Sequence, residues 1–302
     1  MQIHRSAVEI VIQAPAKLNL FFEVLAKRGD GYHEIETLIC PINRFDTVLF
    51  RAESNGRVDF HCITSRGFGE KASAGLGVIP EGCDNLAVRA VELLRQRAGI
   101  RAGAFLRLVK RIPAASGLGG GSSDAAAALV AAQIGWKLDW PPAELARLAA
   151  ELGSDVPFFL AGGAAVCRGR GERIEPLQSL GELHFVVVRP PEGLSTPAVY
   201  GQCLPADNAK PLAPLIAAFG RGEVGEAGRL LFNRLQPAAS RLSSWIARLQ
   251  RIFQQSDCLG HGMSGSGSAY FGLCRHAIHA RRLARRLEAR GVGYVFAVRS
   301  CR

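Results

Sequence analysis

The sequence predicts a protein of about two domains that contains both strands and helices. Its length of 302 residues exceeds that of one average domain. Hydrophobic residues make up 48% of the chain, which is typical of a globular protein and excludes a wholly disordered one. Strand-like and helix-like segments alternate along the chain, and Gly162 and Gly163 separate two halves. We therefore expect an N-terminal domain over residues 1–162 and a C-terminal domain over residues 163–302.

The first half begins with a predicted strand over residues 9–24. Leu18 and Leu20 fall on one face of this strand, whereas Lys17 and Asn19 fall on the other and are expected to face a cleft. Further strands are expected over 47–52, 58–63 and 104–110, and helices over 85–98, 123–133 and 142–152, with Gly153 ending the last of these. Residues 65–82 are rich in Gly and Ser and predict a loop.

The second half begins again with strands. These are expected over 164–168 and 184–189, and helices then dominate to about residue 255. A glycine-rich turn, a strand over 268–274, a helix over 277–291 and a strand over 292–298 complete the chain. We find no internal repeat and no low-complexity tail.

The chain is basic, with a formal net charge of +11. Such a charge suits an anionic ligand, a nucleic acid or a membrane surface. It is spread along the chain except in residues 276–290, where Ile278, Leu283 and Leu287 indicate an amphipathic helix with a basic face. A solvated face is the favoured interpretation, and contact with RNA or a membrane is the alternative. We expect neither a nucleic acid nor a membrane as partner.

Nothing in the sequence indicates export. The most apolar stretch, residues 125–134, is too short to span a bilayer, and residues 1–15 lack the apolar core of a signal peptide. The eight cysteines are far apart and form no C-x-x-C pair, which favours reduced thiols. His276 and His279 have helical spacing but no neighbouring third ligand, so we expect no metal held by side chains alone. A cytoplasmic protein is expected.

The most informative segment is a Gly/Ser run followed at once by an alanine-rich helix. It comprises Pro113, Ala114, Ala115, Ser116, Gly117, Leu118, Gly119, Gly120, Gly121, Ser122 and Ser123. Glycines let backbone amides approach a ligand closely, and a helix N-terminus offers free N–H groups and a partial positive charge. The run therefore predicts a phosphate-binding loop. A flexible turn before a surface helix is the alternative.

Three better-known phosphate motifs do not fit this run. A Walker P-loop needs Lys followed by Ser or Thr after its last glycine, and no such Lys is present. A dinucleotide fingerprint needs a third glycine where Ser122 stands. The H-R-D and D-F-G signatures of protein kinases are also absent.

The run closely resembles the nucleotide-binding motif of the GHMP small-molecule kinases. Two more segments match motifs of that family in the family's order: Pro15-Ala16-Lys17-Leu18-Asn19-Leu20 and Gly262-Met263-Ser264-Gly265-Ser266-Gly267-Ser268-Ala269. The resemblance implies an ATP-dependent kinase that uses Mg²⁺. It also implies an α+β fold, with a domain like the second domain of ribosomal protein S5 followed by a ferredoxin-like domain. The predicted elements agree with that fold but do not define it alone.

Two further segments narrow the resemblance. Arg28-Gly29-Asp30-Gly31-Tyr32-His33-Glu34 and Gly153-Ser154-Asp155-Val156-Pro157-Phe158-Phe159 are similar to family members that phosphorylate the 2-hydroxyl of 4-diphosphocytidyl-2-C-methyl-D-erythritol in the non-mevalonate isoprenoid pathway. The implied partners are this cytidyl diphosphate and ATP, with the protein a monomer or weak homodimer. Alternatives are a GHMP kinase with a mevalonate-like or sugar substrate, and a nucleic-acid-binding protein on an S5-like fold.

The resemblance implies roles for particular residues. Asp155 matches the general base and Lys17 its cationic partner near the acceptor hydroxyl, although from the residues alone Asp155 fits an N-cap or Asx-turn role equally well. Ser122 and Ser123 are candidates for phosphate or Mg²⁺ contact, with N-capping as the structural alternative. We interpret Asp124 as structural, since a carboxylate would repel phosphates.

Substrate and nucleotide contacts follow from the same resemblance. Tyr32 and Tyr200 match aromatic residues that stack on cytosine, His33 matches a residue that binds its edge, and Asn19 is expected near Lys17. Ordinary core packing is the alternative for both tyrosines. Asn85 matches the adenine side. The chain departs from many family members at Ala114, Ala115 and Ser116, where they carry glycine.

Overall fold

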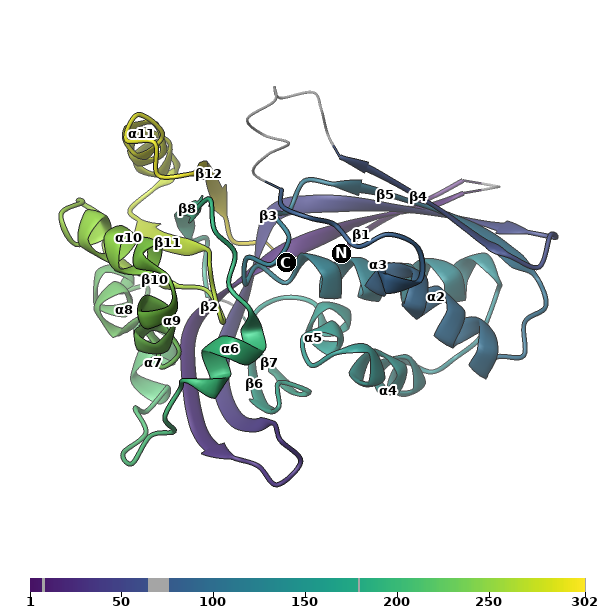
Figure 1. Cartoon of the computed structure of the whole chain (residues 1–302), viewed down its shortest axis with the longest axis horizontal. Helices are drawn as coiled ribbons and strands as arrows, with labels where there is room; N and C mark the ends of the chain where they lie inside the picture. Colours follow the sequence, from purple (N-terminus) through teal and green to yellow (C-terminus); the bar gives the residue numbers. More distant parts are fainter. Residues whose placement is uncertain (7–8, 65–75, 179, 302) are drawn as a thin grey trace. The chain divides into compact units, whose positions relative to one another are not determined.

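The computed structural model of the chain describes residues 1–6, 9–64, 76–178 and 180–301 (Figure 1). It divides into two compact units. The first comprises Met1–Ala16, Arg44–Ala114 and Gly119–Gly162, and the second comprises Lys17–Asn43, Ala115–Leu118 and Gly163–Arg302. The second unit thus takes two segments from the N-terminal half of the chain. The division into sequence domains at residue 162 stays a prediction.

The first unit contains a sheet whose inner face is apolar. Its strands lie in the order β1 (Gln2–Arg5), β2 (Ile10–Lys27), β3 (His33–Glu53), β5 (Gly103–Lys110) and β4 (Val58–Thr64), and β2 and β3 continue into the second unit. Along β5, Leu106 and Leu108 are buried whereas Arg107 is exposed. This alternation directs one face of the sheet towards a core and the other away from it.

Helices cover the inner face of that sheet (Figure 1). They are α2 (Leu86–Arg97), α3 (Gly120–Gly135), α4 (Pro142–Leu152) and α5 (Val156–Ala161). The alanines at 125–128 of α3 are fully buried, because their small side chains allow α2 and α5 to pack closely on α3. α3 is therefore a central helix of this unit rather than a surface helix.

The second unit contains a sheet with the strand order β10 (Gly260–Met263), β11 (Tyr270–Cys274), β8 (His184–Arg189) and β12 (Tyr294–Arg299). All three pairings are antiparallel. The helices α10 (Ser244–Gln254) and α11 (Ala277–Glu288) pack against these strands, with Phe253 and Leu283 buried in the core. This is a βαββαβ arrangement, which confirms the predicted ferredoxin-like fold.

The second unit contains further elements in addition to the continuations of β2 and β3. They are β6 (Ala165–Gly169), β7 (Arg173–Pro176), β9 (Phe232–Asn233), α6 (Thr196–Gly201), α7 (Ala213–Gly220), α8 (Val224–Leu230) and α9 (Gln236–Leu242). β9 pairs with β2 at Phe21, and β6 pairs with β3 from Ile35 to Ile39. β9 therefore pairs with β2 two residues beyond Asn19.

Several predicted elements are confirmed and others are corrected. The helices predicted over 85–98 and 142–152 and the strand over 184–189 match α2, α4 and β8. α3 begins at Gly120, three residues earlier than predicted, because Gly119 adopts a left-handed conformation (φ 69°) that starts the helix. The prediction missed the first part of β3, and α5. Of the loop predicted over 65–82, residues 65–75 lie outside the described residues and Gly82–Asp84 form a short 3-10 helix.

Candidate active site

Lys17 and Asn19 are two residues apart on β2, and both are almost fully buried. The Lys17 ammonium donates a hydrogen bond of 2.5 Å to Oδ1 of Asn19. The Asn19 amide donates in turn to Thr37 Oγ1 at 2.9 Å, and Thr37 donates to the carbonyl of Phe21 at 2.6 Å. A buried ammonium needs such polar partners, since burial without them is costly. This chain of hydrogen bonds fixes the direction of the Lys17 side chain.

The same segment of β2 is bound to two other loops of the second unit. The backbone N–H of Lys17 donates to the carbonyl of Leu118 at 2.9 Å, and that of Asn19 donates to Ser264 Oγ at 3.2 Å. Ser264 donates to the carbonyl of Gly117 at 3.0 Å, and Ala269 N–H donates to Ser116 O at 2.9 Å. The three segments singled out in the sequence thus meet at one place within this unit.

Glycines allow this close approach. Gly117 has φ of +75°, and a Cβ there would lie 2.1 Å from the carbonyl oxygen of Ser264. Gly265 has φ of +55°, and a Cβ there would lie 3.1 Å from Asn19 Oδ1 and 3.3 Å from Lys17 Nζ. Both positions require a left-handed backbone that favours glycine, and the first has no space for any side chain. The glycine at 265 also keeps the vicinity of the ammonium open.

The N-terminus of α3, in the first unit, carries polar groups that make no hydrogen bonds within the helix. Ser123 N–H donates to Gly119 O, so the earlier amides of Gly120, Gly121 and Ser122 precede the helical hydrogen-bond pattern. A Cβ at Gly121 would meet nothing within 4 Å. Ser123 Oγ is buried and has no hydrogen-bond partner among the described residues. These groups suit a phosphate ligand at the positive end of the helix dipole.

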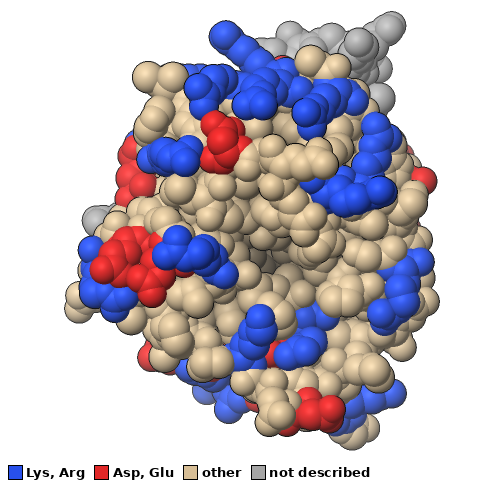
Figure 2. All heavy atoms as spheres, turned by 90° about the vertical axis from the view of Figure 1, so that its left-hand side faces the viewer, with Lys and Arg blue, Asp and Glu red and all other residues tan. Residues whose placement is uncertain are grey.

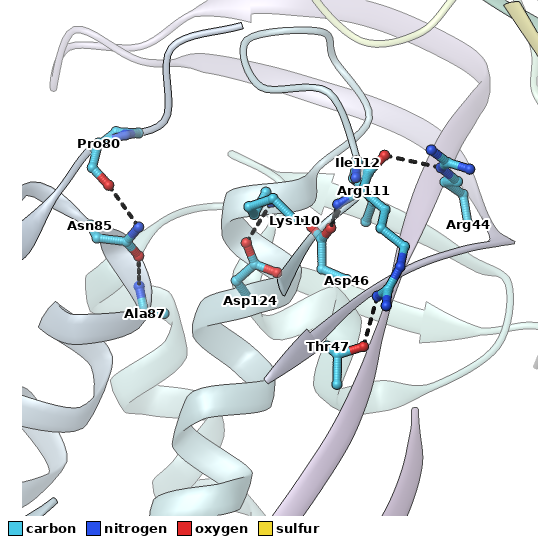
Figure 3. A network of polar contacts seen from close by, with 10 residues as sticks. All are labelled: Arg44, Asp46, Thr47, Pro80, Asn85, Ala87, Lys110, Arg111, Ile112 and Asp124. Carbon is cyan, nitrogen blue, oxygen red and sulfur yellow. Dashed lines mark hydrogen bonds and ion pairs between the residues drawn. The ribbon is translucent and has the colours of Figure 1, made fainter. Parts of the chain in front are cut away.

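Asn85 is a helix cap in this structure (Figure 3). Its Oδ1 accepts from Ala87 N–H at 3.0 Å, and its Nδ2 donates to the carbonyl of Pro80 at 2.9 Å. These bonds orient the start of α2 and leave one amide hydrogen of Asn85 for another partner. A contact with adenine therefore stays a prediction.

Asp155 is half-buried and directly precedes α5 in the first unit. It occupies the N-cap position of that helix, but its side chain makes no capping hydrogen bond. The N-cap alternative raised by the sequence therefore does not account for this carboxylate. Lys17 belongs to the second unit.

The aromatic residues singled out in the sequence all lie in the second unit. Tyr32 is 51% exposed and Arg170 covers its ring at 4.7 Å from the ring centroid. The rings of His33 and Tyr200 are 5.0 Å apart and tilted by 33°. Partial burial, and then the charge of Lys27, hold the pKa of His33 below its ordinary value. His33 is therefore neutral near pH 7 and has one N–H donor and one acceptor nitrogen.

The family model "GHMP kinases N terminal domain" matches residues 85–163, and "GHMP kinases C terminal" matches residues 215–293. A relative from Pelotomaculum thermopropionicum is 42% identical over 92% of this chain and 93% of its own length. The chain belongs to the GHMP kinase family.

Two relatives of this GHMP kinase carry the same name. The Pelotomaculum protein and one from Polaromonas sp. (40% identical, covering 88% of this chain and 84% of the relative) are both named 4-diphosphocytidyl-2-C-methyl-D-erythritol kinase. A crystal structure of 4-(cytidine 5'-diphospho)-2C-methyl-D-erythritol kinase matches with a TM-score of 0.80 and 37% identity, over 96% of this chain and 98% of that one.

More distant structures share the fold. Homoserine kinase from Cytophaga hutchinsonii matches with a TM-score of 0.74 at 19% identity, over 98% of this chain and 96% of that one. The predicted two-part GHMP kinase fold is thus confirmed. The protein is a small-molecule kinase of this family, an ATP-dependent phosphotransferase.

Three residues near the predicted site of this GHMP kinase escaped the sequence analysis. Thr37 and Ser264 hold Asn19, and Arg170 covers Tyr32. Ser264 lies within a segment that the sequence did single out, so its motif was a usable signal. Thr37 and Arg170 had no signal in the sequence, because their roles depend on strand pairing and on a turn that bring distant residues together.

No helix of the described residues is long and apolar enough to cross a membrane. In the same part of the chain, no three His, Cys, Asp or Glu side chains are grouped so as to hold a metal ion.

The helix α11 has an exposed basic face, formed by Arg281, Arg282, Arg285 and Arg286. Figure 2 shows basic side chains along the upper part of the face that includes this helix.

Proposed function

We propose that this GHMP kinase transfers the γ-phosphoryl group of ATP to the 2-hydroxyl of 4-diphosphocytidyl-2-C-methyl-D-erythritol. The hydroxyl oxygen forms a bond to the γ-phosphorus, the bond from that phosphorus to the bridging oxygen breaks, and ADP leaves. The observation that carries the proposal is a set of hydrogen bonds. Lys17 binds Asn19 through its ammonium and Leu118 through its backbone, and Ser264 connects Asn19 with the carbonyl of Gly117. The shared name of the relatives and the structural match support the choice of substrate.

Two charged side chains take the chemical roles in this proposal. Asp155 accepts the proton of the 2-hydroxyl as the phosphoryl group moves, which is the ordinary work of a general base. Lys17 favours the developing negative charge on the acceptor oxygen. The fixed direction of Lys17 supports its role, and the resemblance of residues 153–159 to the family supports the role of Asp155.

The nucleotide phosphates lie in this proposal along residues 113–123. The free amides at the start of α3 bind phosphate oxygens, and Ser122 and Ser123 provide hydroxyls. Mg²⁺ that accompanies ATP neutralises charge on the phosphates, and the buried, unpartnered Ser123 Oγ suits contact with the ion or with a phosphate oxygen. Asn85 is proposed on the adenine side.

The cytidine end of the substrate is assigned to the aromatic residues of the second unit. Tyr32 stacks on the cytosine ring, Tyr200 contacts its other side, and neutral His33 binds its edge by hydrogen bonds. The exposure of Tyr32 and the proximity of His33 to Tyr200 support this assignment. Asn19 holds the substrate near Lys17. The proposal places the enzyme in the cytoplasm as a monomer or weak homodimer.

A substrate panel tests the proposal. ADP formation is measured with the purified chain, ATP and Mg²⁺ against the cytidyl diphosphate, mevalonate, homoserine and galactose. We expect kcat/KM for the cytidyl diphosphate to exceed the others by at least about 10³-fold, because polar groups that read the base reject substrates without it. If another acceptor gives an equal or higher kcat/KM, the cytidyl diphosphate is not the preferred substrate and the proposal is wrong.

A further inference from the structure

A buried network of charged side chains lies beside the predicted phosphate loop, and the mechanism above leaves it without a role. Lys110 ends β5, Asp46 lies on β3 and Asp124 lies near the start of α3. All three are at most 3% exposed. Figure 3 shows the Lys110 ammonium between the two carboxylates. All three residues belong to the first unit.

Asp46 holds the point where the chain leaves β5. Its Oδ1 accepts hydrogen bonds from the backbone N–H groups of Arg111 and Ile112, the second at 2.9 Å. Its Oδ2 accepts from Lys110 Nζ. One carboxylate thus fixes three consecutive residues at the entrance to the loop.

Asp124 connects the same ammonium to α3. Its Oδ2 accepts from Lys110 Nζ at 2.7 Å, whereas its Oδ1 is buried without a partner among the described residues. A Cβ at Gly120 would lie 2.9 Å from Ile112 Cγ2 and 3.2 Å from Lys110 Nζ, so the first residue of α3 packs directly on this pair. One lysine therefore joins both ends of the segment from Arg111 to Gly119.

Stability alone does not explain these charges. Apolar residues of similar volume often stabilise a fold as well as a buried ion pair does, because removing charges from water is costly. Burial opposes the charge on Lys110, but the two carboxylates outweigh it and raise the pKa of the ammonium. Lys110 thus remains a cation with three directed donors, which can set a geometry that apolar contacts leave loose.

We propose that Lys110, held between Asp46 and Asp124, is a positioning residue that sets the first turn of α3 for the nucleotide phosphates. The segment it spans contains Ala115, Gly117 and Gly119, all with positive φ. Without a fixed connection, such a segment lets the start of the helix shift relative to β5. A shift of the amides of Gly120–Ser122 weakens their hydrogen bonds to phosphate oxygens.

Asp124→Ala is the test variant, because it cuts only the connection to α3. Lys110 keeps Asp46 as its counter-ion, so no buried charge is left alone. Lys110→Met is less suitable, since it would leave two buried carboxylates without a cation. We expect the ATP dissociation constant, measured by calorimetry, to rise by about 10- to 100-fold in Asp124→Ala, as for loss of one or two charge-assisted hydrogen bonds.

Two further variants separate positioning from stability. Asp124→Asn keeps an oxygen that can accept from Lys110, and we expect its ATP dissociation constant to stay within about threefold of wild type. Leu94→Ala removes a buried side chain of α2 and lowers the melting temperature, and it should leave ATP binding unchanged. In steady state, Asp124→Ala should raise KM for ATP while KM for the acceptor stays within about twofold.

The inference rests on the proposed function only in taking ATP as the ligand of α3. An ATP dissociation constant of folded Asp124→Ala within twofold of wild type would overturn it, as would an equal rise in Leu94→Ala. The ATP dissociation constants of wild type and Asp124→Ala are measured without an acceptor. Their ratio therefore tests the inference even if the acceptor of the proposed function is wrong.

Discussion

The Lys17 ammonium lies 2.5 Å from Oδ1 of Asn19, two residues further along the same strand. Asn19 carries no charge, so it directs the ammonium without neutralising it. Its own orientation depends on Thr37, which accepts from Nδ2 and donates to the carbonyl of Phe21. A hydroxyl on the neighbouring strand β3 therefore helps to direct a candidate catalytic cation.

The first prediction concerns this hydroxyl. Thr37→Val keeps the shape of the side chain but leaves the Asn19 amide without its acceptor, at a cost of about 1–3 kcal/mol. If part of that cost is expressed as a misdirected Lys17, kcat should fall by about 5- to 50-fold. Thr37→Ser keeps the hydroxyl and should retain most of the activity. Steady-state kinetics with wild-type turnover in Thr37→Val would show that Thr37 has no part in directing Lys17.

The second prediction concerns the proposed general base. Asp155→Asn should lower kcat by about 10²–10⁴-fold, or roughly 3–5 kcal/mol of barrier, because an amide cannot accept the hydroxyl proton. Lys17→Met should behave similarly. ATP affinity, measured by calorimetry, should change little in both. Asp155→Asn with more than a tenth of wild-type kcat, and chemistry shown to limit the rate, would remove Asp155 from that role.

The third prediction tests the close approach at Gly117. Gly117→Ala forces a side chain into a left-handed position where its Cβ would lie 2.1 Å from Ser264 O. We expect the free energy of unfolding to fall by at least about 2 kcal/mol, since the backbone must move. Gly225→Ala in α8 is the matched control, because it has no neighbour within 4 Å and no positive φ. It should be neutral or stabilising by up to about 1 kcal/mol. Urea unfolding that shows no difference between the two variants would contradict this.

The fourth prediction concerns the cytosine contact of Tyr32. Tyr32→Ala should weaken substrate binding by roughly 1–3 kcal/mol, about 5- to 150-fold, if the ring stacks on the base. An analogue without cytosine should bind wild type and variant about equally, and ATP affinity should not shift. An equal loss for the intact substrate and the analogue would make Tyr32 a packing residue.

The fifth prediction is a pH dependence at His33. Because the pKa of this ring is lowered, the neutral form predominates at and above its ordinary value of about 6.5. KM for the cytidyl diphosphate should therefore stay constant as pH falls to about 6.5 and rise only below it, where protonation removes the acceptor nitrogen. His33→Gln should abolish that rise. A KM that improves on acidification would show that the cationic ring binds the substrate.

Local signals predicted α2 and α4 well. Asn85 caps α2 and Pro142 starts α4, as their residue types indicate, because a cap or a first turn depends on residues only a few positions away. The first part of β3 was missed although Glu34, Ile35 and Glu36 alternate like a strand, because Pro41 interrupts the segment and proline is unusual inside a strand. That strand is nevertheless formed, since β6 pairs with it from Ile35 to Ile39.

The sequence by itself determined the family and predicted the phosphate loop and the candidate pair Lys17 and Asp155, because these depend on short motifs in a fixed order. Only the tertiary structure decided which residues support them. Ser264 reaches Asn19 across 245 positions, and Asp46 and Lys110 are 64 apart. Neither contact has a local signature, because it exists only when strands and helix termini from distant parts of a unit pack together and leave buried polar groups that must find partners.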